Sequence, residues 1–274
     1  MIFTKMHCVC NDFLILNGFD DLEDVGEELP VKVCNRHLGI GADGLIIVLY
    51  TNDADFKIDF YNQDGVKSSC STNVLRCAAK YALENKIVEK TMFSVDTDNG
   101  IKYVTVNEDD SLTINIGEPI FTPQLIPVDY TGDDFIEKVI SVGADDYVVN
   151  CVSVNSNPCT VIFTDSTDSL NDMELNKVAP YIEKHNIFPN RTNVVFANIV
   201  DNSTIQARCW QINIGEVIGC DFGAAAAFVV ANFMGKVDDK SKVELYGGDL
   251  SMELSDDNFA YVTGFAENVF EINW

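Results

Sequence analysis

Hydrophobic and polar residues alternate along much of the chain, and this alternation predicts many short strands. Two segments depart from it, at about 72–85 and 224–234, where apolar residues fall on most sides of a helix. A third helical pattern covers about 171–185. The predicted strands are residues 57–61, 92–95, 101–106, 112–116, 147–154, 160–163, 193–200 and 204–210, with residues 1–7 alternating like an edge strand.

The two apolar helices occupy equivalent places in a repeated pattern. In each half of the chain, strands lead to a turn that carries a cysteine, then to the apolar helix, then to more strands. A helix that is apolar on most faces must be covered by other elements, so we expect each one to pack inside its own sheet. The fold class is therefore α+β, with two similar lobes.

Domain boundaries follow from the same repetition and from a proline-rich segment at 119–127. We predict an N-terminal lobe over 1–118 and a C-terminal lobe over 119–262. The last strands, 263–274, are expected to return to the first lobe. An active site is expected in the cleft between the lobes.

Charge excludes several classes of partner. The chain of 274 residues has a formal net charge of -25 at pH 7 and no basic run longer than a pair. Binding to nucleic acid or to an anionic membrane needs clustered Lys and Arg, so neither is expected. The longest apolar stretch is far shorter than the roughly 20 residues that span a bilayer. With no leader pattern at its start, the chain is expected to be cytoplasmic.

Cysteine usage favours reduced thiols over disulfides or metal ligands. There are 9 cysteines, an odd number, and only 3 histidines. No Cys-x-x-Cys pair is present, and Cys8-Val9-Cys10 has the wrong spacing for a zinc site. We therefore expect no metal site.

The thiols nearest the two apolar helices are the candidates for chemistry. Cys70 precedes the first helix and Cys220 precedes the second. A helix N-terminus presents free N–H groups and partial positive charge, which favour a thiolate and bind a carboxylate. Two such ends could hold an amino acid with one acid/base group on each face of its α-carbon. That arrangement is what a cofactor-free racemase requires, so the expected partner is a small amino acid.

Several motifs resemble the diaminopimelate epimerase family. They include Arg36-His37-Leu38-Gly39-Ile40-Gly41-Ala42-Asp43-Gly44, Asn62-Gln63-Asp64-Gly65, Arg76-Cys77-Ala78-Ala79-Lys80-Tyr81, Phe188-Pro189-Asn190-Arg191-Thr192-Asn193-Val194 and Gly247-Gly248-Asp249-Leu250. The resemblance runs from residue 5 to residue 270. It implies two pseudosymmetric lobes, each a sheet or barrel around a central helix, and pyridoxal-free inversion of an α-carbon by a thiol pair. It also suggests a homodimer.

The first catalytic turn departs from the family pattern. In the family it begins Cys-Gly-Asn-Gly, and without gaps that cysteine falls on Ser71, followed by Thr72, Asn73 and Val74. A cysteine stands one place earlier, at Cys70. Ser71 or Cys70 is therefore the counterpart of Cys220, and a serine hydroxyl is a poor base at neutral pH without an activating partner.

The second catalytic turn keeps its thiol but differs at the next two positions. Cys220 is retained, whereas Asp221 and Phe222 replace the family's Gly and Thr. Asp221 would oppose a bound carboxylate unless it points away or is protonated, and it could also serve as the helix N-cap. The family's Trp-Glu-Arg-Gly is here Trp210-Gln211-Ile212-Asn213, so the arginine that pairs with a distal carboxylate is missing.

Polar residues in family register complete the expected substrate site. They are Asn11, Asn62, Thr72, Asn73, Asn157, Asn193, Gln211, Asp221 and Phe222. In addition, Cys8 and Cys10 replace glycines of the family and are expected to crowd the turn before Asn11.

Three functions remain open. The first is a racemase or epimerase that acts on an amino acid other than diaminopimelate, with Cys220 as one acid/base. The second is a lyase that removes an α-proton and expels a β-hydroxyl, because only one competent thiol is certain. The third is a non-catalytic paralogue, since the chemical motifs have changed while the scaffold motifs are intact.

Overall fold

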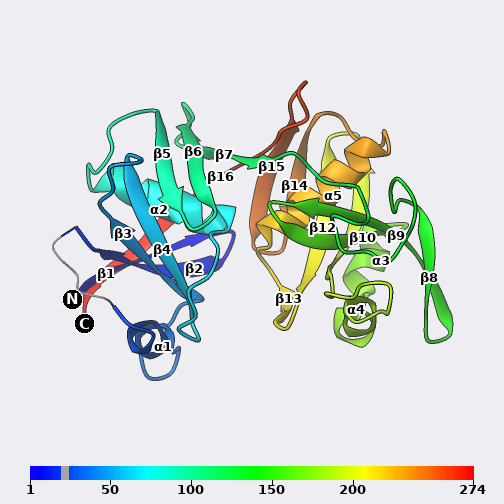
Figure 1. The fold of residues 1–274 in the computed structure, drawn as a ribbon, viewed down its shortest axis with the longest axis horizontal. Coiled ribbons are helices and arrows are strands. Elements are labelled where there is room, and N and C mark those ends of the chain that lie inside the picture. Colours follow the sequence, from blue (N-terminus) through cyan, green and yellow to red (C-terminus); the bar gives the residue numbers. More distant parts are fainter. Residues whose placement is uncertain (20–24) are drawn as a thin grey trace. The chain divides into compact units, whose positions relative to one another are not determined.

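A computed structural model describes residues 1–19 and 25–274. The chain divides into two compact units: Met1–Asn115 with Thr263–Trp274, and Ile116–Val262. Figure 1 shows that each unit is a sheet with a long helix packed against it. The boundaries between the units fall inside β7 (Leu112–Gly117) and β16 (Ala260–Gly264).

The first unit is built on one continuous order of strands. From β17 the order is β1, β2, β3, β4, β5, β6 and β7, parallel at β2–β3 and β4–β5 and antiparallel elsewhere. Helix α1 (Glu28–Cys34) connects β2 to β3, and α2 (Thr72–Glu84) connects β4 to β5. The remaining bounds are β1 Ile2–Cys8, β2 Asn11–Asn17, β3 Gly44–Leu49, β4 Phe56–Asn62, β5 Met92–Thr97, β6 Gly100–Val106 and β17 Glu267–Asn273.

The second unit repeats this topology. Strand β9 pairs with β10 antiparallel, β10 with β11 parallel, β11 with β12 antiparallel, β12 with β14 parallel and β14 with β15 antiparallel. Helix α5 (Asp221–Phe233) lies between β12 and β14 in the chain, as α2 lies between β4 and β5. The other bounds are β8 Lys138–Val142, β9 Asp145–Val154, β10 Asn157–Phe163, α3 Thr167–Asp172, α4 Leu175–Glu183, β11 Asn193–Asp201, β12 Thr204–Gln211, β13 Gly215–Val217, β14 Lys240–Leu245 and β15 Gly248–Leu254. The α+β prediction with two similar lobes is confirmed.

Both apolar helices are packed inside their units, as their composition predicted. Helix α5 contacts β9, β10, β11, β12, β14 and β15, and its residues Ala224–Ala231 are all buried. Alanine side chains let the helix backbone approach the strands closely. Each helix N-terminus is therefore held in place by core packing, which suits it to a precise binding site.

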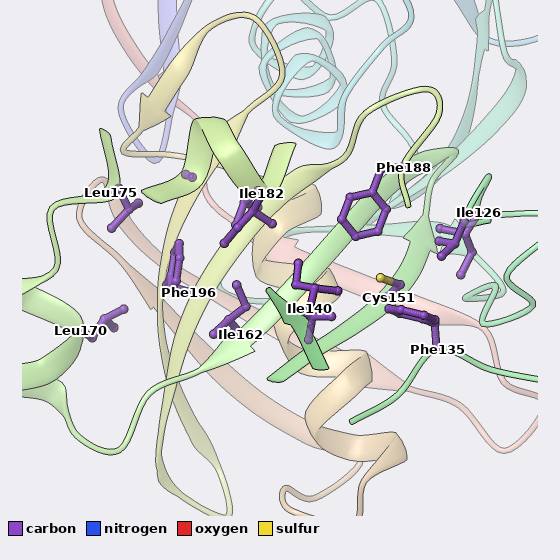
Figure 2. Close-up of a cluster of buried hydrophobic side chains, with 14 residues drawn as sticks. Ile126, Phe135, Ile140, Cys151, Ile162, Leu170, Leu175, Ile182, Phe188 and Phe196 are labelled. Atoms are coloured by element: carbon purple, nitrogen blue, oxygen red, sulfur yellow. The ribbon is translucent and has the colours of Figure 1, made fainter. Parts of the chain in front are cut away.

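A second hydrophobic core covers the other face of the sheet in the second unit. Figure 2 shows Leu170, Leu175 and Ile182 from α3 and α4 packed towards Ile162 and Phe196 of the sheet. Because side chains alternate along a strand, Phe196 belongs to this core while its neighbours Val195 and Ala197 face the opposite side. The sheet is thus buried on both faces, and α5 has a rigid platform.

Two local predictions are wrong. The alternating residues 1–7 do not form an edge strand, because β1 pairs with β2 on one side and with β17 on the other. The two chain ends lie together, with the Met1 amino group donating to the Trp274 carbonyl at 2.9 Å (Figure 1). The helix expected over 171–185 is two helices, α3 and α4, which are separated at Met173 and Glu174.

Candidate active site

Ser71 is the residue that begins α2. It is the N-cap of the helix, and its Oγ accepts a hydrogen bond from the Val74 N–H at 3.3 Å. This bond satisfies one of the free N–H groups at the helix end. The serine residue is half-buried, so it retains contact with solvent.

Cys70 lies one residue earlier and belongs to the interior. Its side chain is buried, and this burial raises the pKa of its thiol to about 12, with further upward shifts from Asp98 and Asp59. The thiol is therefore protonated at neutral pH. Of the two alternative counterparts of Cys220, Ser71 occupies the helix end and Cys70 does not.

A chain of polar side chains surrounds the N-terminus of α2. Arg76 is fully buried, and its guanidinium donates to the Thr72 Oγ1 at 3.3 Å and to the Asn73 Oδ1. The Asn73 Nδ2 donates to the Asn11 Oδ1 at 3.2 Å, and the Asn11 Nδ2 donates to an Asp43 carboxylate oxygen at 2.7 Å. The structure thus brings Asn11, Thr72 and Asn73 together at this helix end.

Asn62 occupies a different position in the same unit. It ends β4, opposite Gly44, and its backbone N–H donates to the Val66 carbonyl at 3.0 Å in the next turn. These contacts fix the backbone of Asn62. They do not involve its side chain, so its role as a substrate ligand stays a prediction.

The turn before Asn11 accommodates residues that replace glycines of the family. Val9 and Cys10 both have positive φ, 43° and 64°. Left-handed backbone is unfavourable for residues with a Cβ, at about 1–2 kcal/mol per residue, and most of all for a β-branched one such as Val9. Of the two cysteines that replace glycines of the family, Cys10 therefore has an unfavourable backbone conformation, whereas Cys8 is not among the residues with positive φ. Crowding of the turn stays a prediction.

Cys220 is the residue that begins α5, as Ser71 begins α2, but its side chain makes no capping hydrogen bond. It is the N-cap of α5, and it is 3% exposed. The prediction of a thiolate at this helix end is wrong. Burial raises the pKa of the Cys220 thiol well above its usual value of 9.0, and a hydrogen bond with Cys209 and the charge of Asp221 shift it in the same direction. The loss of hydration outweighs the helix dipole, so Cys220 carries a proton at neutral pH.

Asp221 is the first residue inside α5, and the N-cap position expected for it belongs to Cys220. Its side chain is buried, and its carboxylate accepts a hydrogen bond from the Phe222 N–H at 2.8 Å. One of the N–H groups expected to hold the substrate carboxylate is therefore bound to Asp221.

Asn193 links three strands close to α5. Its Nδ2 donates to the Pro158 carbonyl at 2.9 Å, and its Oδ1 accepts from the Ile212 N–H at 3.0 Å. Asn157 is held separately, with its Nδ2 donating to the Asn155 carbonyl at 2.9 Å. Asn193 thus holds the backbone of β10 against the end of β12, a structural role that its family register did not reveal.

Gln211 and Ile212 lie at the end of β12, near α5. Strand alternation places Gln211 on the same face as Cys209, which is the face that packs against α5. Ile212 carries no charge where the family resemblance leads one to expect arginine. Arg191 is bound elsewhere, because its Nη1 donates to Glu183 at 3.1 Å and to the Asn213 Oδ1.

Cys209 and Glu183 could not be identified by the motifs. Cys209 and Cys220 both place their sulfurs beside Gly223, where an added Cβ would be 2.4 Å from the Cys209 Sγ and 3.0 Å from the Cys220 Sγ. The strand alternation that points Cys209 and Gln211 to one face could have identified Cys209. Glu183 is buried and accepts from Arg191 and from the Trp210 Nε1, the latter at 2.8 Å. Nothing local marked Glu183, because both of its partners lie on other elements.

Residues 1–19 and 25–274 contain no group of three or more His, Cys, Asp or Glu arranged to hold a metal ion. Within the same residues, no helix is both long and apolar enough to cross a membrane.

Comparison with known proteins agrees with this architecture. The family model for diaminopimelate epimerase matches residues 3–122 and 152–269. A diaminopimelate epimerase of Agathobacter rectalis is 37% identical, covering 98% of both chains, and one of Acetivibrio thermocellus is 34% identical, covering 99% of this chain and 97% of the relative. The crystal structure of a hydroxyproline epimerase from Agrobacterium vitis has the same fold, with a TM-score of 0.68 at 12% identity over 99% of this chain and 91% of that one. Taken with the repeated topology, these matches show that the chain belongs to the diaminopimelate epimerase family.

Proposed function

We propose that this protein is a pyridoxal-independent amino-acid isomerase whose substrate lacks the second carboxylate of diaminopimelate. Cys220 and Ser71 are the two groups that exchange a proton with the α-carbon. The observation that carries the proposal is the position of Ile212. Its backbone is fixed by Asn193 at the end of β12, and its side chain brings no charge to the place where a distal carboxylate would need one.

A second carboxylate on the substrate would carry an energetic cost. A carboxylate that leaves water without a cationic partner costs several kcal/mol, which corresponds to a loss of affinity of more than about a hundredfold. Arg191 does not replace the missing arginine, because Glu183 and Asn213 already bind its guanidinium. A smaller or less anionic amino acid avoids this cost.

The groups at the two helix ends, Cys220 and Ser71, have different roles in the proposed proton transfers. One group takes the α-hydrogen as a proton and leaves its electron pair on the carbon, and the other delivers a proton to the opposite face. The product contains the same atoms with inverted configuration. Cys220 is protonated at rest and is therefore suited to deliver the proton. Ser71 has to accept one, and a hydroxyl does this slowly.

Solvent-deuterium exchange tests the proposal. The protein is incubated in D2O with separate L- and D-amino acids and with diaminopimelate, and loss of the α-proton signal is followed by NMR. We expect exchange with inversion for an amino acid with a single carboxylate and little or none for diaminopimelate. A matched variant, Ile212→Arg, restores a partner for the second carboxylate and is expected to raise the exchange of diaminopimelate by about tenfold or more.

The alternative functions are outcomes of the same experiment. Formation of a keto acid from a hydroxy amino acid would show a lyase and overturn the isomerase proposal. Absence of exchange across the whole panel would show a non-catalytic paralogue. Efficient turnover of diaminopimelate by the unsubstituted protein would contradict the role given to Ile212.

Ser71→Cys is expected to preserve or increase the exchange rate. A thiol is a far better proton acceptor than a hydroxyl, and a cysteine at the N-cap of α2 would lie at a helix end that favours its thiolate. Initial exchange rates should rise by about tenfold or more if proton removal limits the reaction. Ser69→Cys, at an exposed position two residues earlier, is the control and should leave the rate unchanged. A loss of exchange in Ser71→Cys alone would argue against Ser71 as the counterpart.

A further inference from the structure

The motif at 36–44, one of those that resemble the family, forms a loop that returns to its own first residue. The Arg36 Nη2 donates to the Asp43 Oδ1 at 2.7 Å. Gly41 has a φ of 86°, and a Cβ added there would be 3.0 Å from the Arg36 Cα, so glycine permits this close approach. The Lys5 Nζ donates to the Gly41 carbonyl at 2.7 Å. The loop therefore holds the Asp43 carboxylate in a defined place.

The second oxygen of Asp43 connects this loop to the start of α2. It accepts a hydrogen bond from the Asn11 Nδ2 at 2.7 Å, and the Asn11 Oδ1 accepts from the Asn73 Nδ2 at 3.2 Å. The Asn73 Oδ1 in turn accepts from the Arg76 guanidinium. These four side chains form one hydrogen-bonded series, which we call the amide chain, and all of them belong to the first unit.

The two ends of the amide chain fix the direction of both amides between them. A guanidinium can only donate, and a carboxylate can only accept. The Asn73 Oδ1 therefore has to face Arg76, which leaves the Asn73 Nδ2 for Asn11. The Asn11 Oδ1 accepts that bond, which leaves the Asn11 Nδ2 for Asp43. Reversal of either amide would place two donors or two acceptors against each other.

Solvent reaches one end of the amide chain and not the other. Arg76 is 0% exposed and Asn73 is 1% exposed, whereas the Asp43 side chain is 41% exposed. A polar group without a partner costs more at the buried end, where no water can replace the lost bond. A change at Asp43 is therefore expected to free the Asn11 amide, while the bond between Arg76 and Asn73 persists.

We propose that Asp43, held by Arg36, is a positioning residue for Asn11: its carboxylate holds the Asn11 amide in one place and one direction at the start of α2. The Asn11 Nδ2 carries two hydrogens, and Asp43 accepts one of them. The other is a donor for a carboxylate or carbonyl oxygen of a substrate. This last role rests on the proposed function. The direction of the amide does not, because it involves one unit and no substrate.

Asn11→Asp tests the contact through its chemistry. The substitution keeps an acceptor for the Asn73 Nδ2, but it sets two carboxylates against each other at residues 11 and 43. Asp43→Asn added to it supplies a donor opposite the new carboxylate and keeps an oxygen for Arg36. In the unsubstituted protein, Asp43→Asn instead replaces an acceptor that both Asn11 and Arg36 use. Asp43→Asn is therefore expected to have opposite effects in the two backgrounds.

Urea unfolding at pH 7, followed by circular dichroism, measures these effects as the ratio of folded to unfolded protein. We expect Asn11→Asp to lower this ratio about tenfold or more, and Asp43→Asn alone to lower it about threefold. The double variant should have a ratio about fivefold or more above that of Asn11→Asp.

NMR of the side-chain amides shows whether Asp43 holds Asn11. In nitrogen-labelled protein, the Asn11 amide signals are those that Asn11→Asp lacks. We expect Asp43→Ala to move one of the two proton signals upfield, because the strong bond to a carboxylate is lost. In the same folded variant, exchange of the amino acid used by the unsubstituted protein should fall about tenfold or more. Asp55→Ala removes another carboxylate of this unit, one that accepts from Lys90 at 2.6 Å, and should change neither.

The outcomes separate the contact from its catalytic meaning. Equal effects of Asp43→Asn in the two backgrounds, or unchanged Asn11 amide signals in Asp43→Ala, would overturn the proposal. Shifted Asn11 signals with a normal exchange rate would overturn the positioning role. A protein that exchanges no amino acid but shows the reversed effect and the shifted signals would contradict only the proposed function.

Discussion

Cys220→Ala is expected to abolish amino-acid isomerisation, with a fall in the exchange rate of at least about a thousandfold. The substitution removes the thiol at the N-cap of α5 and leaves the helix in place, because Cys220 makes no capping bond with its side chain. Deuterium incorporation into the preferred amino acid, followed by NMR, measures the loss.

The control for Cys220→Ala is Cys151→Val in the same unit. Cys151 lies in the hydrophobic core on the face of the sheet away from α5, and burial raises the pKa of its thiol to about 12. Its replacement should change the exchange rate by less than about threefold, since volume is nearly conserved. Exchange by Cys220→Ala at the rate of Cys151→Val would refute the role of Cys220.

Arg76→Ala should cause the largest loss of stability, about 3–5 kcal/mol in the free energy of unfolding. Arg76 is fully buried, and the substitution leaves a cavity and removes the donors to Thr72 and Asn73. Urea denaturation followed by circular dichroism gives the change. Lys80→Ala on the same helix is the control, because its partner Glu84 lies 3.7 Å away at a partly exposed site, and such a pair contributes only about 0.3–0.5 kcal/mol. Equal losses in the two variants would show that Arg76 does not hold the end of α2.

Much of the scaffold follows from local pattern. The predicted helix over 72–85 corresponds to α2, Thr72–Glu84, because an apolar stretch after a serine cap can form little else. The repeated order of strands and helices predicted two similar lobes, and the pairing of β9 to β15 repeats that of β1 to β6. These features depend on residues close together in the chain.

The errors concern properties that depend on distant residues. The alternation of β1 could not identify β17 as its second partner, because that strand comes from the other end of the chain. The state of Cys220 depends on how deeply α5 is buried and on Cys209 from β12, neither of which its own motif contains. The local pattern placed Cys220 at the helix end correctly, but burial decided its protonation.

In the candidate site, too, the sequence predicted some positions correctly and missed contacts that depend on the folded structure. Asn11, Thr72 and Asn73 were chosen by family register, and hydrogen bonds bring all three to one helix end. Asp221 was expected to oppose a substrate carboxylate or to cap the helix. The structure gives the N-cap position to Cys220 and pairs the Asp221 side chain with the Phe222 N–H, a contact that depends on the exact start of α5. Its effect on a substrate carboxylate stays a prediction.

The stereochemical course of the reaction tests the central claim most directly. The amino acid that exchanges is supplied to the unsubstituted protein in D2O as the pure L form and, separately, as the pure D form, and chiral chromatography follows both. We expect the two reactions to converge on the same mixture of enantiomers, with one deuterium at the α-carbon of each inverted molecule. Exchange with full retention of configuration, or conversion to a keto acid, would contradict it.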